Sequence, residues 1–147
     1  MKALVVYDSQ FGNTEAIAQA IAGAAPRRAA WAVRVGDVKD SDLTSVDVLA
    51  VGSPTRGGRS TPAITAFLDG IPAGSLAKVR VAAFDTRMTI FIAKLFGWAA
   101  DRIAAALSAK GGLPAAKPEG FIVKGREGPL ADGERDRAAV WAKGFLG

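Results

Sequence analysis

The sequence predicts an α/β fold in which one domain, residues 1–147, forms a doubly wound parallel sheet of five strands. Two observations lead to this prediction. Short apolar runs without polar alternation, such as 2–7 and 78–84, are typical of strands buried on both faces of a sheet. Segments with helical patterns separate these runs, and this alternation favours parallel strands joined by right-handed helical crossovers. A chain of this length forms a single core.

Each element can be placed along the chain. Strands are expected over residues 2–7, 30–35, 47–52, 78–84 and 120–123. Helices are expected over residues 14–25, 62–68, 90–109 and 132–145. Proline and glycine support these bounds: Pro26 ends the first helix, Thr61 and Pro62 begin the second, and Gly111-Gly112 ends the third.

The composition excludes several kinds of chemistry. The chain has no cysteine and no histidine, which excludes disulfides, thiolate nucleophiles, the Ser-His-Asp arrangement and any zinc or haem site built on those ligands. We therefore expect neither catalytic residues nor a metal, and redox chemistry would have to come from a cofactor. The net charge is +5, but the basic residues are scattered and lack interleaved aromatic residues, so we do not expect a nucleic-acid partner.

The hydropathy pattern bears on location. No apolar stretch reaches the length of a membrane span, and the first residues lead directly into a core strand without a signal-peptide pattern. A cytoplasmic protein without a membrane span is the expectation.

The turn after the first strand has the features of a phosphate-binding turn. Its residues are Ser9, Gln10, Phe11, Gly12, Asn13 and Thr14. Two hydroxyl groups, a glycine and the unpaired N–H groups of a helix start would surround an anion. It lacks the Gly-Lys-Ser/Thr ending of a Walker loop and the repeated glycines of a dinucleotide-binding loop. An ordinary turn in which Asn13 or Thr14 caps the helix stays open as an alternative.

Two further loops follow the third and fourth strands. In a sheet of this kind, ligands bind at the carboxyl ends of the strands, where the strand order reverses. Glycine, hydroxyl groups and arginine dominate both loops, which suits the close approach of a flat polar ligand. The candidate ligand-binding residues are Pro54, Thr55, Arg56, Gly57 and Gly58 in one loop, and Asp85, Thr86, Arg87 and Met88 in the other.

The three loops resemble those of the flavodoxin family, and the resemblance covers nearly the whole chain. Flavodoxins hold the phosphate of FMN in a Thr/Ser-x-Thr-Gly-x-Thr turn. Ser9, Gly12 and Thr14 match this turn, whereas Phe11 replaces the middle hydroxyl. Residues 52–55 look like the loop under the flavin, and the Thr-Arg-Gly that begins at residue 55 also resembles the flavodoxin-like NAD(P)H:quinone oxidoreductases.

The resemblance implies a strand order of 2-1-3-4-5, with FMN bound at the reversal of strand order. Residues 85–88 stand where the family has its third FMN loop, and no insertion splits the last predicted strand, as in short-chain members. The candidate residues of the three loops are thereby implied to bind FMN. The implied function is electron transfer to a redox partner protein.

Two features depart from the family. Flavodoxins usually enclose the flavin with Trp or Tyr from the second and third loops, but here Phe84, Arg56 and Met88 are the nearest substitutes. A guanidinium plane such as that of Arg56 can stack on a ring. Flavodoxins are also usually acidic, whereas a net charge of +5 favours an acidic partner.

Two alternatives to an electron carrier stay open. One is a small FMN-dependent enzyme, such as a quinone reductase or a relative of the flavodoxin-like protoporphyrinogen oxidases. The other is a flavin-free binding or regulatory domain that keeps the fold. Trp31, Trp98 and Trp141 lie outside the loops and are interpreted as packing residues, and the apolar run 90–96 as the buried side of a helix or a dimer contact. Both a monomer and a dimer are compatible with this pattern.

Overall fold

The structure, a computed structural model, describes residues 1–89 and 97–147. The strands are β1 (Ala3–Tyr7), β2 (Ala30–Arg34), β3 (Val48–Pro54), β4 (Arg80–Arg87), β5 (Leu113–Pro114) and β6 (Glu119–Ile122). The helices are α1 (Asn13–Gly23), α2 (Asp40–Leu43), α3 (Pro62–Gly70), α5 (Ala99–Ala109) and α6 (Glu134–Leu146). Two single 3₁₀ turns, Pro26–Arg28 and Val35–Asp37, flank β2.

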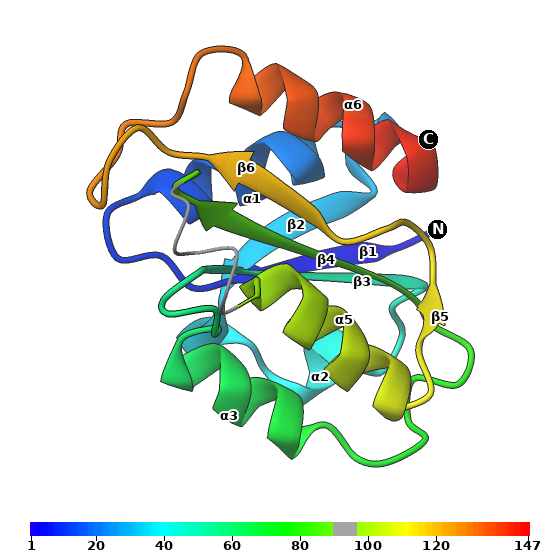
Figure 1. The fold of residues 1–147 in the computed structure, drawn as a ribbon. Helices are drawn as coiled ribbons and strands as arrows, with labels where there is room; N and C mark the ends of the chain where they lie inside the picture. Colours follow the sequence, from blue (N-terminus) through cyan, green and yellow to red (C-terminus); the bar gives the residue numbers. More distant parts are fainter. Residues whose placement is uncertain (90–96) are drawn as a thin grey trace.

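The described strands form one parallel sheet in the order β2-β1-β3-β4-β5, with β6 also paired to β4 (Figure 1). The predicted parallel sheet and its strand order are confirmed. The prediction of a single last strand at 120–123 is incomplete. Two short strands, β5 and β6, both pair with β4. Pro114 and Pro118 explain the interruption, since neither has an N–H group with which to continue the ladder.

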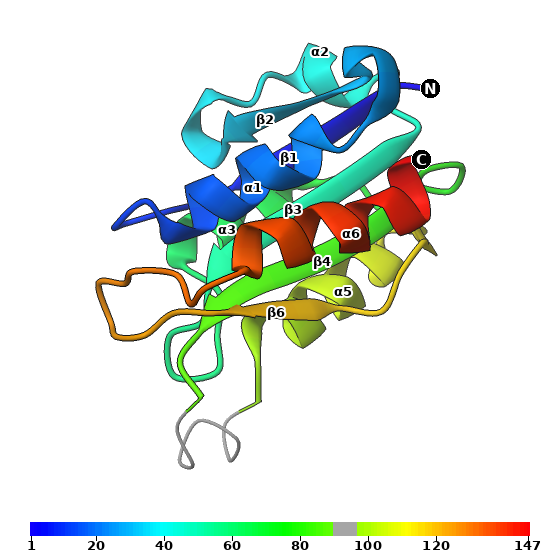
Figure 2. The ribbon, with the colours of Figure 1, turned by 90° about the horizontal axis from the view of Figure 1, so that it is seen from above.

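Helices cover both faces of the sheet, as predicted for buried parallel strands. Figures 1 and 2 show α1 and α6 side by side on one face and α3 and α5 on the other. Successive side chains of a strand point to opposite faces. Val5 therefore packs in one core with α1 and α6, whereas Leu4 and Val6 pack in the other with α3 and α5. The sheet thus separates two cores, which differs from the single core expected from the chain length.

Glycine is required where β3 and β4 run side by side. A Cβ atom on Gly52 would lie 2.1 Å from the ring of Phe84, which is fully buried. The small residue in β3 lets this ring lie against the backbone, and the position tolerates no larger residue without repacking.

The helix predicted over 90–109 needs correction. Residues 90–96, including the apolar run proposed as a dimer contact, lie outside the described residues. Gly97 has a φ of 80° and Trp98 is extended, so α5 begins only at Ala99. A left-handed glycine followed by an extended residue cannot lie within a helix, and the periodic apolar pattern alone did not reveal this boundary.

The remaining differences are small. The single-turn helix α2 and the strand β5 were missed, because elements of four and two residues are too short to show periodicity. Trp31 and Trp141 pack against the two cores, as predicted. Trp98 instead covers the guanidinium of Arg87, with 4.0 Å from its Cζ to the ring centroid. In the part of the chain that the structure describes, no helix combines the length and apolar character needed to cross a bilayer.

Candidate functional site

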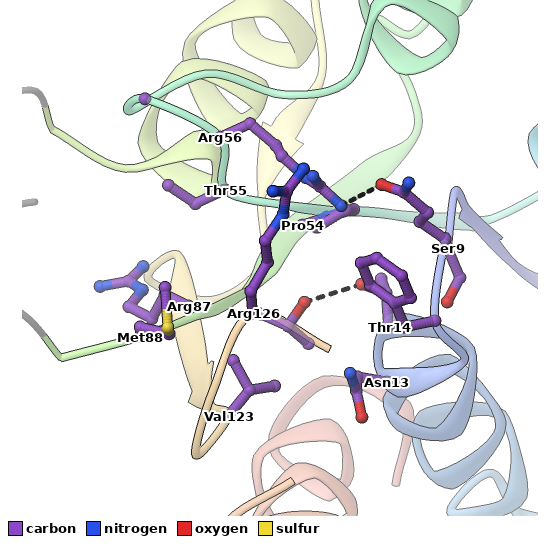
Figure 3. Close-up of a pocket in the computed structure, with 14 residues that line it drawn as sticks. Ser9, Asn13, Thr14, Pro54, Thr55, Arg56, Arg87, Met88, Val123 and Arg126 are labelled. Atoms are coloured by element: carbon purple, nitrogen blue, oxygen red, sulfur yellow. Dashed lines mark hydrogen bonds between the residues drawn. The ribbon is translucent and has the colours of Figure 1, made fainter. Parts of the chain in front are cut away.

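The carboxyl ends of β1, β3, β4 and β6 meet at one edge of the sheet, and their loops enclose a cavity of about 280 Å³ (Figure 3). This volume is near the lower end of the range for small-molecule sites, roughly 300–1,000 Å³. The cavity is lined by Ser9, Gln10, Phe11, Asn13, Thr14, Pro54, Thr55, Arg56, Gly57, Thr86, Arg87, Met88, Val123 and Arg126.

The structure brings most of the predicted site residues together in this cavity. Gly12, Gly58 and Asp85 are exceptions, because they do not line it. Gly12 precedes α1 with a φ of 90°, a conformation that favours glycine. The carbonyl of Gly58 accepts a hydrogen bond from Arg102 Nε at 2.8 Å. The carboxylate of Asp85 is fully buried behind the cavity wall.

Val123 and Arg126 were not predicted to belong to the site. They lie on the loop that connects β6 to α6, whereas the predicted site consists of the loops after the first, third and fourth strands. The sequence did offer a signal for Arg126. It follows the last predicted strand, and loops at the carboxyl ends of parallel strands share the edge where ligands bind. The side-by-side pairing of β6 with β4 brings this loop to the site.

The turn between β1 and α1 contributes hydrogen-bond donors to the lining of the cavity. Ser9 Oγ accepts a hydrogen bond from the N–H of Gly12 at 3.1 Å, so the Ser9 hydroxyl hydrogen stays available for a ligand. Among the described residues, the N–H groups of Phe11, Asn13 and Thr14 have no protein acceptor. A helix of 11 residues starts here, and the positive end of its dipole adds to the attraction of an anion.

Charged side chains beneath the turn hold it in place. Arg34 Nη1 donates to the carbonyl of Ser9 at 2.8 Å, and Arg34 Nη2 lies 3.3 Å from Glu15 Oε1. The hydroxyl of Tyr7 donates to Glu15 Oε2 at 3.2 Å. Burial raises the pKa of Tyr7, and the nearby Glu15 carboxylate raises it further. Tyr7 therefore stays a neutral donor under ordinary conditions.

Thr14 and Thr86 connect two of the loops. Their Oγ1 atoms lie 2.8 Å apart, and both residues are buried (Figure 3). One hydroxyl donates to the other, which leaves one hydroxyl hydrogen available in the cavity. The pair links the start of α1 to the end of β4 at the base of the cavity.

The loop after β3 is a tight turn that carries Arg56. The backbones of Arg56 and Arg59 exchange two hydrogen bonds, at 2.9 and 3.0 Å, around Gly57 and Gly58, which both have positive φ. The guanidinium of Arg56 donates to Gln10 Oε1 and lies 5.7 Å from the ring centroid of Phe11. Arg56 thus joins the loop after β3 to the turn after β1.

Arg87 also lines the cavity, but neighbouring side chains engage its guanidinium. Its Nε and Nη2 donate to the two oxygens of Asp85 at 2.7 and 2.8 Å, and Trp98 covers its guanidinium. A Cβ atom on Gly120 would lie 2.0 Å from Arg87 Nε, so the glycine leaves room for this side chain. Figure 3 shows the Arg87 side chain directed away from Arg56. Asp85 compensates its charge, which leaves Arg56 as the better candidate for a cation beside a ligand.

The cavity is cationic. Among the described residues, no Asp or Glu lines it, and Arg56 and Arg126 have no carboxylate partner. Unpaired N–H groups, hydroxyl groups and two guanidinium groups therefore face the same space. The arrangement is suited to a polar ligand that carries negative charge.

Solved structures with the same fold include several flavodoxins. An archaeal flavodoxin is 24% identical with a TM-score of 0.79, and the similarity covers 99% of this chain and 96% of that one. Flavodoxin 1 of Bacillus cereus is 20% identical with a TM-score of 0.81, covering 99% and 97%. Rubredoxin oxygen:oxidoreductase of Desulfovibrio gigas is 19% identical with a TM-score of 0.76, covering 99% of this chain but 35% of that one.

Sequence comparison gives the family. No curated protein matches the chain. The family model described as Flavodoxin matches residues 5–141, which is most of the sequence. The chain therefore belongs to the flavodoxin family, whose members bind FMN and transfer electrons.

Proposed function

We propose that this flavodoxin-family protein binds FMN in the cavity between the loops after β1, β3, β4 and β6 and carries electrons to an acidic partner protein. The observation that carries this proposal is a set of donors that have no protein acceptor among the described residues, beside a cavity that none of the described carboxylates lines. FMN, when bound, accepts and returns electrons, and the protein sets the ease of each step through charge and hydrogen bonds.

The residues present fit the parts of FMN. The turn at residues 9–14 offers N–H groups and hydroxyl groups to the phosphate, which is an anion. Pro54 and Gly57 provide a surface without bulky side chains, against which a flat ring can lie. Arg56, at the rim, provides a positive charge and a planar group for that ring.

The charge of the chain favours an acidic partner. The net charge is +5, and Arg56, Arg59 and Arg126 stand on loops at the edge of the sheet that holds the cavity. An acidic surface would be steered toward this edge, because opposite charges raise the rate of encounter. A docked partner would then lie close to the cofactor.

The test begins with the purified protein. Apo protein titrated with FMN should quench flavin fluorescence at one equivalent, and the absence of FMN binding would contradict the proposal. The photoreduced protein should then reduce an acidic ferredoxin in a stopped-flow experiment. A quinone reductase, the alternative from a different class, would instead turn over a soluble quinone with NAD(P)H as fast as it reduces any protein.

A further inference from the structure

The loop that connects β6 to α6 places an arginine at the cavity. Arg126 lines the cavity, and Figure 3 shows its side chain pointing toward Arg56 across the space between the loops. Within the described residues, Arg126 has no hydrogen-bond or ion-pair partner. Two like charges that face one cavity repel each other, so an anion bound beside Arg126 would lower its electrostatic energy.

The loop that carries Arg126 is fastened to the turn at residues 9–14. Asn13 Nδ2 donates to the carbonyl of Glu127 at 3.2 Å. A Cβ atom on Gly128 would lie 2.6 Å from Asn13 Oδ1, so the two loops are in close contact. Within its own loop, the N–H of Lys124 donates to the carbonyl of Pro129 at 2.8 Å. Arg126 is therefore attached to the side of the cavity where the unpaired N–H groups lie.

The turn at residues 9–14 has one hydroxyl donor fewer than the flavodoxin turn that it resembles. Phe11 stands where the resemblance to flavodoxins places a hydroxyl, and its side chain cannot bind a phosphate oxygen. A guanidinium group presents several N–H donors in a plane and matches a phosphate in two-point contact. Arg126, on the loop that contacts this turn, can supply the donor that Phe11 does not provide.

We propose that Arg126 binds the phosphate of FMN and so increases the preference of this protein for FMN over riboflavin. The proposal rests on the proposed function, because it assigns a residue to the cofactor of that same site. Arg56 then contacts the flavin ring, and Arg126 contacts the phosphate, so each arginine binds a different part of the same ligand.

The experiment compares the two flavins. Apo protein is titrated with FMN and separately with riboflavin, for the wild type and for Arg126→Gln. The variant should bind FMN about tenfold more weakly or worse, because a charge-assisted hydrogen bond is lost. Its affinity for riboflavin, which has no phosphate, should stay within about twofold.

A matched control variant is available on the same loop. Lys124 is exposed, pairs with Asp132 at 3.6 Å and does not line the cavity. Lys124→Gln removes the same charge and should leave both affinities unchanged. Thermal unfolding of the apo variants gives a second readout: Arg126→Gln should unfold at the wild-type temperature without ligand and gain less stability from saturating FMN concentrations.

The outcomes separate the hypotheses. Equal weakening for FMN and riboflavin would place Arg126 at the ring and overturn its assignment to the phosphate. Unchanged affinity for FMN would remove Arg126 from the cofactor site altogether. If the wild-type chain binds neither flavin, the proposed function itself fails, and the assignment of Arg126 fails with it.

Discussion

Arg56 is the residue that we expect to have the most direct effect on the redox behaviour of this site. It is half-buried at the rim of the cavity, its hydrogen-bond partner is a neutral amide, and no carboxylate of the described residues offsets its charge. The other candidate, Arg87, is compensated by Asp85. A cation beside the ring would stabilise added negative charge, so we expect Arg56 to raise the midpoint potential of bound FMN.

Replacing Arg56 by glutamine should lower the midpoint potential of bound FMN. A charge about 4 Å away contributes about 4 kcal/mol at an effective dielectric of about 20, and solvent exposure reduces this to a fraction. About 1.4 kcal/mol corresponds to about 59 mV for one electron, so a decrease of tens of millivolts is expected. Spectroelectrochemical titration measures it. Arg59→Gln, on the same turn but outside the cavity, is the control, and an equal shift in both variants would exclude a specific role for Arg56.

Replacing Thr14 by valine should weaken FMN binding. The change removes the hydroxyl that pairs with Thr86 at 2.8 Å while keeping the shape of the side chain. We expect about tenfold weaker FMN binding and a smaller effect on riboflavin, together with a loss of about 1–2 kcal/mol in unfolding free energy, because a buried partner is left unpaired. Fluorescence titration and urea unfolding measure these effects. Thr14→Ser keeps the hydroxyl and should retain most of the FMN affinity and most of the unfolding free energy. If Thr14→Ser loses as much as Thr14→Val, the missing hydroxyl is not the cause of these losses.

At the scale of elements, the helix starts are held by side chains from the ends of the strands. The N–H of Ala99 donates to Thr55 Oγ1 at 3.0 Å, and the N–H of Ala100 donates to Asp85 Oδ2 at 2.9 Å. These two acceptors replace a local cap for α5, whose own N-cap residue makes no side-chain hydrogen bond. The helix therefore depends on the same strand ends that build the cavity.

The start of α6 is held by a carboxylate. Glu134 Oε2 accepts a hydrogen bond from the N–H of Ile122 at 2.6 Å, and Glu134 Oε1 accepts one from Arg137 Nε at 2.8 Å. The hydrogen bond from Arg137 lowers the pKa of Glu134, even though burial opposes this shift. These contacts close the base of the loop that carries Arg126.

Replacing Glu134 by glutamine should lower the stability of the protein in a pH-dependent way. The pKa of Glu134 is lower in the folded protein than its ordinary value of 4.5, so its stabilising effect is complete above about pH 4.5 and is lost as the pH falls through the folded pKa. The variant should lose about 2 kcal/mol at pH 7, because a charged hydrogen-bond acceptor is removed, and the difference from wild type should shrink below pH 4.5.

Urea unfolding across a pH series measures this effect. Asp136→Asn removes a charge from the same first turn of α6 and is the control, since Asp136 is exposed. A difference between wild type and Glu134→Gln that stays constant down to pH 3 would contradict a role for the ionised carboxylate.

At the scale of the whole molecule, the charge and the location of the cavity act together. The chain has a net charge of +5, and the four loops with their arginines project from one edge of the sheet. The helices on both faces bury the rest of the sheet, so the cofactor is accessible from this edge. Association with a partner is therefore expected to depend on the ionic strength.

Electron transfer to an acidic ferredoxin should slow steeply as salt is added. The Debye length shrinks from about 30 Å at 0.01 M to about 10 Å at 0.1 M, which removes long-range attraction. Reduction of a neutral soluble quinone should change little over the same range. Stopped-flow rates for both acceptors across a salt series measure the contrast. Rapid quinone turnover together with a salt-independent ferredoxin rate would contradict the carrier function.

The apolar runs and their alternation with helical segments were enough to predict the parallel sheet, because strands buried on both faces need apolar side chains at successive positions. Thr61 was predicted as a helix cap, and its hydroxyl accepts from the N–H of Ile64 at 3.4 Å. The loops after β1, β3 and β4 were also identifiable, since the strand ends of a parallel sheet share one edge. A local sequence pattern is sufficient to predict an element when the contacts that form it lie between residues close in sequence.

The contacts that complete the site join residues distant in sequence, and no local pattern contains them. Arg87 was predicted as a ligand-binding residue, but the sequence did not reveal that Asp85, Trp98 and Gly120 surround its side chain. Arg126 lines the cavity because β6 pairs with β4 and because Asn13 donates to Glu127 on the loop that carries Arg126. Side-chain charge is visible in a sequence, but whether that charge is compensated depends on which groups the folded chain brings within a few ångströms.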